Sequence, residues 1–134
     1  MSALIRSPLH PLLGDSFAVV TVTGRKTGRR ISTPINVFRM EAGWMVVSLR
    51  TRTWWRNLLD GRTGELRHKG KSFPVTARIL NQPDEVKNAL RLYFDRYPAY
   101  AKYFNVRPDA KGRIPNEDLE RVAQERLIIQ LKPG

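Results

Sequence analysis

The sequence predicts an α+β protein, mainly β, in which six antiparallel strands curl into a small barrel with peripheral helices. Short runs of β-branched residues, separated by glycine-containing turns, fill most of the first 80 residues. Longer segments with helical periodicity begin only after them. Strands followed by helices are typical of this class, whereas regular alternation of the two would predict a parallel sheet.

The expected strands are bounded by residues that favour turns. Phe17–Thr23 is β-branched and lies between Gly14 and Gly24, which indicates a buried strand. The remaining expected strands are Ile31–Met40, Trp44–Leu49, Gly64–Lys69, Ser72–Leu80 and Leu127–Leu131. Because Glu41–Gly43 favours a tight reversal, we expect the first three strands to form an antiparallel meander.

The clearest helix begins at Pro83 and runs to Tyr97. Proline suits the first helical position, and Asp84 and Glu85 suit the positive end of the helix dipole. Pro98 should break this helix. Shorter helical segments are expected at Trp54–Leu59, at Ala99–Phe104 and from Asn116 through Ala123.

Length and composition limit the possible classes of protein. With 134 residues, 41% of them hydrophobic, the chain can bury one core, so we expect a single domain over residues 1–134. The absence of cysteine excludes disulfides and thiolate metal sites. We expect a cytoplasmic protein, because no apolar run is long enough to cross a bilayer and the first residues do not resemble a signal peptide.

Hydrolytic and metal chemistry are disfavoured by the residues present. His10 and His68 have no partners at metal-ligand spacing, so no metal site is expected. No serine lies in a nucleophile-elbow motif, and no pair of carboxylates stands out.

The charge balance favours an anionic partner. Lys and Arg number 24 against 12 Asp and Glu, which gives a net charge of +12. Phosphates, polycarboxylates, nucleic acids and acidic lipids would all be attracted. Residues 24–30 place four cations and two glycines in one turn, which is either a phosphate cradle or a solvated hairpin tip.

Two aromatic clusters are further candidates for a site. Trp54 and Trp55 precede Asn57, so one indole is expected in the core and the other beside a cleft, with packing alone as the alternative. Tyrosines recur every three residues from Tyr97 through Tyr103. Their phenols could line up as hydrogen-bond donors, or they could cap a core.

Together these segments resemble the deazaflavin-dependent nitroreductase and quinone reductase family, a branch of the split β-barrel flavin and deazaflavin oxidoreductases. The resemblance spans about residues 17–103 and resumes in the last strand. The matching motifs are Thr21–Gly28, Thr33–Pro34, Val47–Ser48, Trp54–Leu58 and Tyr97–Tyr103.

The resemblance implies a split barrel, similar to the FMN-binding split barrels, that binds the anionic coenzyme F-420 (8-hydroxy-5-deazaflavin), with FMN as the alternative cofactor. It implies hydride transfer from the reduced coenzyme to a small hydrophobic acceptor, either a quinone or a nitro compound. The implied cofactor-binding residues are Arg25, Lys26, Arg30, Thr33, Pro34, Ser48, Leu49, Arg50, Trp54 and Asn57. The implied donors to the acceptor are Tyr97, Tyr100, Tyr103 and Ser48.

Two other functions remain open from the residues alone. The charge and the aromatic residues interleaved with arginine in Arg52–Arg56 also suit a β-barrel that binds nucleic acid, which the family resemblance disfavours. A split barrel that binds a flavin or a fatty acid without turnover is the second alternative. Monomer and homodimer are both open, as is peripheral contact with a membrane.

Overall fold

A computed structural model describes residues 16–40 and 42–134. The expectations about the first residues, and about Glu41 in the reversal, lie outside this range. The described chain divides into two compact units. The first contains residues 16–40, 42–47, 51–79 and 129–134, and the second contains residues 48–50 and 80–128. The single domain over residues 1–134 stays a prediction.

Seven strands form one sheet, and most of them match the expected runs. They are β1 (Phe17–Thr23), β2 (Arg30–Asn36), β3 (Phe38–Met40), β4 (Gly43–Leu49), β5 (Gly64–His68), β6 (Lys71–Leu80) and β7 (Arg126–Pro133). The helical segments are η2 (Trp54–Leu58), α2 (Pro83–Arg96), η3 (Pro98–Phe104) and α3 (Asn116–Glu125). The α+β, mainly β fold class is therefore confirmed.

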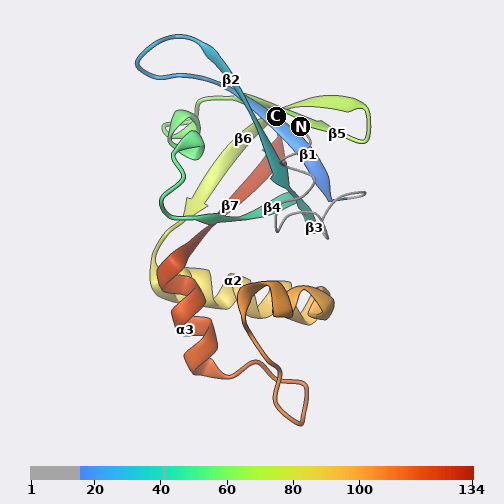
Figure 1. Ribbon diagram of the computed structural model, residues 1–134. Coiled ribbons are helices and arrows are strands. Elements are labelled where there is room, and N and C mark those ends of the chain that lie inside the picture. Colours follow the sequence, from blue (N-terminus) through green and yellow to red (C-terminus); the bar gives the residue numbers. More distant parts are fainter. Residues whose placement is uncertain (1–15, 41) are drawn as a thin grey trace. The chain divides into compact units, whose positions relative to one another are not determined.

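The strand order shows that the sheet curls upon itself. Its order is β2-β1-β5-β6-β7-β4-β3, so β2 and β3 are the first and last strands of the order, although the end of β2 runs to β3 in Figure 1. In the chain, however, only Val37 separates them. A flat sheet of this width would place its edges about 29 Å apart, which one residue cannot span. The two edges must therefore meet at Val37, as in a barrel.

The count of six strands is wrong, because the expected strand Ile31–Met40 is two strands. β2 pairs with β1, whereas β3 pairs with β4. At the junction, the amide of Val37 donates to the carbonyl oxygen of Ser16 at 2.7 Å. Residues 35–38 are all buried, so the alternation of a two-faced strand is interrupted where the chain changes partner.

The core of the first unit lies on one face of its strands. Ala18, Val20 and Val22 of β1 are buried, while Thr21 between them is only half-buried and Thr23 is exposed. At Gly43, a Cβ would overlap the carbonyl oxygen of Leu131, and its φ of +148° also favours glycine. This close approach fixes β4 against β7.

The second unit is built on α2 and α3. Val86, Leu90, Tyr93 and Phe94 form the buried face of α2, at the spacing that predicted this helix. The two helices are also joined through Lys87 Nζ and Glu120 Oε1 at 3.4 Å. No helix in the described part of the chain is long and apolar enough to cross a membrane.

Candidate functional site

The basic turn, residues 24–30, joins β1 to β2 and has a closed backbone. The amide of Gly24 donates to the carbonyl of Arg29 at 2.7 Å, and the amide of Gly28 donates to the carbonyl of Gly24 at 2.9 Å. Gly28 has a φ of +71°, which glycine adopts without strain. The backbone of the turn is therefore held in a defined conformation by its own hydrogen bonds, while its four cations are exposed.

Asn57 fixes the basic turn from a distant part of the sequence. Its Oδ1 accepts a hydrogen bond of 2.9 Å from the backbone N–H of Arg25. Its Nδ2 donates to the carbonyl of Trp54 at 3.1 Å, within η2. Both polar atoms of the side chain are thus engaged by the protein. Asn57 acts on the predicted cofactor site by holding the turn in place.

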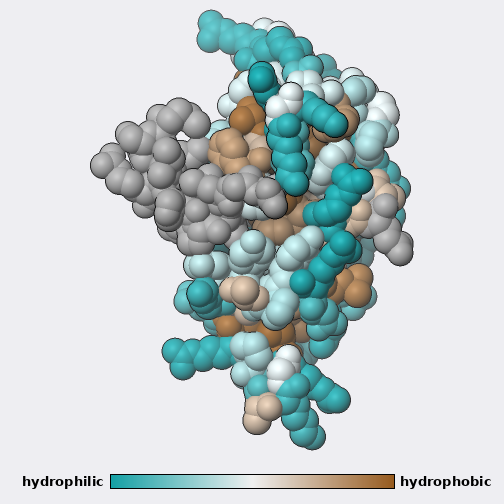
Figure 2. Space-filling view, turned by 90° about the vertical axis from the view of Figure 1, so that its right-hand side faces the viewer, coloured by the Kyte–Doolittle hydropathy of each residue, from teal (hydrophilic) through white to brown (hydrophobic). Residues whose placement is uncertain are grey.

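The cations of the basic turn lack acidic partners. Arg25, Lys26, Arg29 and Arg30 are exposed, and none of them takes part in a salt bridge among the residues that the structure describes. Hydrophilic side chains project over much of the face drawn in Figure 2. Like charges held close together by the backbone repel one another, so a bound anion would stabilise this turn.

The two tryptophans of η2 are both buried. Trp54 is 7% exposed and Trp55 is 8% exposed, so both indoles pack in the core, which agrees with the packing alternative. The guanidinium of Arg56 lies over the Trp55 ring, with its Cζ 5.5 Å from the ring centroid. This cation–π contact holds a further positive charge on the helix that Asn57 ties to the turn.

Thr33 and Pro34 lie in the middle of β2, where they are half-buried. They pair with Val20 and Val19 of β1. The structure places them on the same strand as Arg30, which is the first residue of β2.

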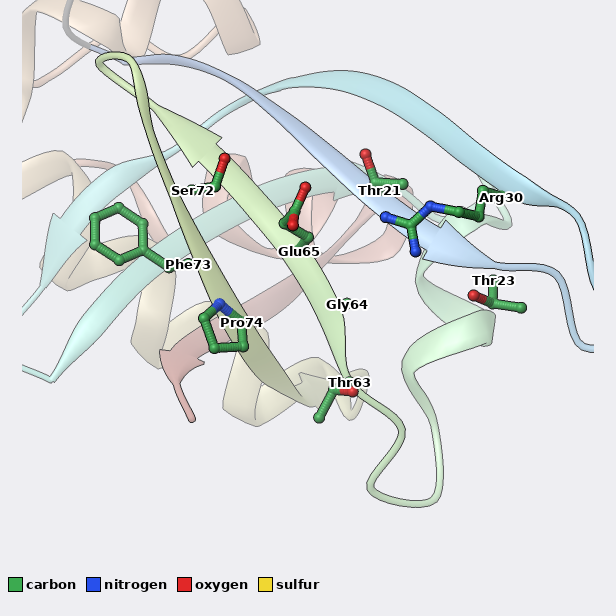
Figure 3. Close-up of a pocket in the computed structure, with 9 residues that line it drawn as sticks. All are labelled: Thr21, Thr23, Arg30, Thr63, Gly64, Glu65, Ser72, Phe73 and Pro74. Carbon is green, nitrogen blue, oxygen red and sulfur yellow. The ribbon is translucent and has the colours of Figure 1, made fainter.

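A pocket of about 310 Å³ opens on the first unit beside the basic turn. We call it the β1–β5 pocket. Arg30 is the one predicted site residue that lines it, and Figure 3 shows the Arg30 guanidinium lying between Thr21 and Thr23. The remaining lining residues are Thr63, Gly64, Glu65, Ser72, Phe73 and Pro74. Sequence reasoning missed this pocket, because its residues come from four strands.

Ser48, Leu49 and Arg50 belong to the second unit. Ser48 is buried, and its hydroxyl donates to the carbonyl of Leu49 at 3.2 Å. The Arg50 guanidinium donates to the carbonyl of Ala123 at 2.8 and 3.2 Å and to the carbonyl of Asn81 at 2.9 Å. Arg50 therefore binds the negative end of α3, which is a structural role.

The three predicted tyrosines gather on η3 and its first flanking residue. The ring centroids of Tyr97 and Tyr100 are 5.9 Å apart, and those of Tyr100 and Tyr103 are 6.2 Å apart. Tyr97 and Tyr100 are half-buried, while Tyr103 is 38% exposed. The three rings therefore lie next to one another, and both the donor role and the core-capping alternative agree with this arrangement.

Two residues that sequence reasoning did not assign to the site extend this tyrosine cluster inward. Tyr93 is fully buried, with its ring centroid 5.8 Å from that of Tyr97. Burial raises the pKa of its phenol well above the usual range, the nearby phenols of Tyr100 and Tyr97 raise it further, and Arg126 opposes them. Tyr93 therefore stays protonated at neutral pH.

Arg126 provides a positive charge beside the cluster. Its Cζ lies 4.9 Å from the centroid of the Phe104 ring. Burial lowers the pKa of its guanidinium, while Glu125 and Tyr93 act in the opposite direction. The spacing of Tyr93 and Tyr97 could have predicted that both lie on one side of a helix. The position of Arg126 beside the cluster could not be predicted from the sequence, because it depends on the tertiary fold.

Comparison of the sequence with protein-family models gives a match over residues 8–110 to the F-420H(2)-dependent quinone reductase family. The chain belongs to this family. The family is named for its dependence on F-420H(2), so the resemblance found in the sequence is confirmed. A search of curated proteins gave no significant match.

Solved structures similar to this F-420H(2)-dependent quinone reductase family member share its fold. A protein of unknown function from Agrobacterium tumefaciens is 20% identical, with a TM-score of 0.58, over 98% of this chain and 53% of that one. The heme storage protein HutZ from Vibrio cholerae is 12% identical, with a TM-score of 0.54, over 92% and 84% of the two chains. A conserved hypothetical protein from Mycobacterium tuberculosis is 12% identical, with a TM-score of 0.53, over 99% and 80%.

The residues of this quinone reductase family member fit an anionic coenzyme. The four exposed cations of the basic turn have no acidic partner among the described residues, and the backbone holds them together. Guanidinium and ammonium groups are the usual partners of phosphates and carboxylates in proteins.

Proposed function

We propose that this protein is an oxidoreductase in which a hydride passes from reduced coenzyme F-420 to a quinone or nitro-type acceptor. The observation that carries the proposal is the basic turn, whose cations form no salt bridge with any residue that the structure describes and whose Arg25 backbone is held by Asn57. Membership of the quinone reductase family supports the same coenzyme. When bound, the reduced coenzyme supplies the hydride.

The basic turn would bind the charged part of the coenzyme. Arg25 and Lys26 are exposed and adjacent, so they can engage a phosphate or a carboxylate without first breaking an ion pair within the described chain. Arg30 would add to this charge from the start of β2. The other residues of the proposed coenzyme site are Thr33, Pro34, Ser48, Leu49, Arg50, Trp54 and Asn57, of which Arg50 and Asn57 act by holding backbone.

The tyrosine cluster would stabilise the acceptor. Phenol O–H groups can donate to the negative charge that develops on acceptor oxygens during reduction. Tyr97, Tyr100 and Tyr103 are the proposed donors. Ser48 ranks behind them, because its hydroxyl already donates to the Leu49 carbonyl. Tyr93 supports the cluster from the core, and its raised pKa keeps its proton in place.

The test is a titration of the purified full chain with oxidised coenzyme F-420 and, separately, with FMN. We then follow the absorbance of the reduced coenzyme after menadione is added. The proposal expects saturable binding that favours the deazaflavin, together with oxidation that depends on menadione. Tight oligonucleotide binding without coenzyme binding or turnover would overturn it and favour the nucleic-acid alternative.

A further inference from the structure

The β1–β5 pocket carries two opposite charges that do not neutralise each other. Arg30 and Glu65 both line it, and neither forms a salt bridge within residues 16–40 and 42–134. Figure 3 shows the guanidinium of Arg30 directed across β1 toward the strand that bears Glu65. Strand pairing places the two residues on either side of β1. Arg30 is opposite Thr23, and Glu65 is opposite Thr21, which lies two residues away on the same strand.

The remainder of the pocket is rich in hydroxyl groups. Thr21, Thr23, Thr63 and Ser72 line it, and each hydroxyl can both donate and accept a hydrogen bond. Thr21 and Thr23 point away from the core, since the residues that alternate with them along β1 are buried. The pocket is therefore a polar depression on the face of the sheet opposite to the core.

The arrangement of charge selects among classes of small molecule. A ligand with only a negative charge would be attracted by Arg30 but repelled by Glu65. A ligand with only a positive charge would be attracted by Glu65 but repelled by Arg30. A molecule with both charges satisfies both residues at once. The guanidinium suits a carboxylate, Glu65 suits an ammonium group, and the hydroxyls between them can bind either.

Size and apolar lining narrow the class further. About 310 Å³ is at the small end of ligand pockets, which suits a molecule of amino-acid size. Pro74 is opposite Glu65 and adds an apolar ring on the pocket face, beside which an apolar side chain can lie. Phe73 is opposite the buried Leu66, and its ring packs against Trp44. We propose that the β1–β5 pocket binds a small zwitterion, an α-amino acid with an apolar side chain, when the coenzyme does not engage Arg30.

The test uses three probes that share one ring and differ only in charge. L-phenylalanine carries both charges, 3-phenylpropanoate carries only the carboxylate, and 2-phenylethylamine carries only the ammonium group. Each is titrated into the isotope-labelled full chain while the backbone amide signals of Thr21, Thr63 and Glu65 are followed by NMR. We expect saturable shifts with L-phenylalanine, and binding about fivefold weaker for each analogue, as for loss of one partly exposed ion pair.

Two variants locate the binding site within the pocket. Glu65→Gln should weaken L-phenylalanine about fivefold and remove its advantage over 3-phenylpropanoate, since the repulsion of a lone carboxylate is gone. Thr63→Val should weaken all three probes. Glu117→Gln changes an exposed carboxylate on α3, outside the pocket, and should leave the binding of every probe unchanged.

Three results would overturn the proposal: no saturable shift at these amides, equal affinity for the three probes, or unchanged selectivity in Glu65→Gln. A direct Arg30–Glu65 ion pair in solution would give the first of these. The outcome is independent of hydride transfer, because it is read from amide signals without coenzyme.

Discussion

The backbone N–H of Arg25 donates a 2.9 Å hydrogen bond to Oδ1 of Asn57, 32 residues later in the chain. This contact joins the basic turn to η2. The same side chain donates from Nδ2 to the Trp54 carbonyl, so the turn and the helix share one amide group. The position of the cations therefore depends on a residue that carries no charge.

Replacing Asn57 tests this dependence. Asn57→Ala removes both hydrogen bonds, so we expect the free energy of unfolding to fall by about 1–2 kcal/mol. We also expect weaker binding of coenzyme F-420, because the amide of Arg25 is no longer held. Urea unfolding and a fluorescence titration measure the two effects. Asn88→Ala, on the exposed face of α2, serves as the control. Unchanged coenzyme affinity in Asn57→Ala would contradict the role given to Asn57.

Two glycines should respond very differently to alanine. At Gly28, a Cβ meets nothing within 4 Å, so only the left-handed backbone opposes it and Gly28→Ala should cost about 1 kcal/mol. At Gly43, the Cβ would overlap the Leu131 carbonyl, so Gly43→Ala should cost more than about 3 kcal/mol. Chemical denaturation compares them. Similar losses in the two variants would mean that β4 and β7 do not pack this closely.

The alkaline limit of stability should depend on Tyr93. Burial raises the folded-state pKa of this phenol, whereas in the unfolded chain it titrates near its usual value of about 10. The folded state then holds a proton that the unfolded state releases, so stability is fully present below pH about 10 and falls as the pH rises further. Tyr93→Phe should flatten this fall. Urea unfolding between pH 8 and pH 11 measures it, and an unchanged slope would count against a buried, protonated Tyr93.

Arg50 should contribute to stability through the carbonyl groups that it binds. Arg50→Met removes the hydrogen bonds to Ala123 and Asn81, so we expect a loss of about 2–3 kcal/mol, as for hydrogen bonds made by charged groups. Arg52→Met, an exposed neighbour, should have little effect. Thermal unfolding compares the two variants. Equal stability would leave the predicted contact with the coenzyme as the main role of Arg50.

Local patterns in the sequence were enough to predict most of the fold. β-branched runs located the strands, and the start of α2 followed from Pro83 and the acidic residues after it. The division between β2 and β3 was missed, because the change of partner at Val37 depends on Ser16 and on the whole curled sheet. No local pattern records such a switch.

The candidate site was predicted where its residues are close in sequence. The basic turn and the tyrosines of η3 are such cases. Three other interactions join segments that are distant in the sequence. They are the hydrogen bond from Arg25 to Asn57, the hydrogen bonds of Arg50 to α3, and the electrostatic interaction of Arg126 with Tyr93. Their partners are set by tertiary packing, which spacing along one chain does not encode.

The most direct test of the account removes charge from the basic turn. In the double variant Arg25→Ala, Lys26→Ala, we expect the affinity for coenzyme F-420 to fall by more than about tenfold, since two exposed ion pairs are lost. Menadione-dependent oxidation at saturating reduced coenzyme should remain close to that of the unchanged protein, as it also should for Lys26→Ala alone. The double variant Arg107→Ala, Lys111→Ala, which removes the same charge from the exposed segment before α3, should bind as the parent does. Coenzyme affinity that is unaffected by removing Arg25 and Lys26, or that falls equally in the two double variants, would contradict the account.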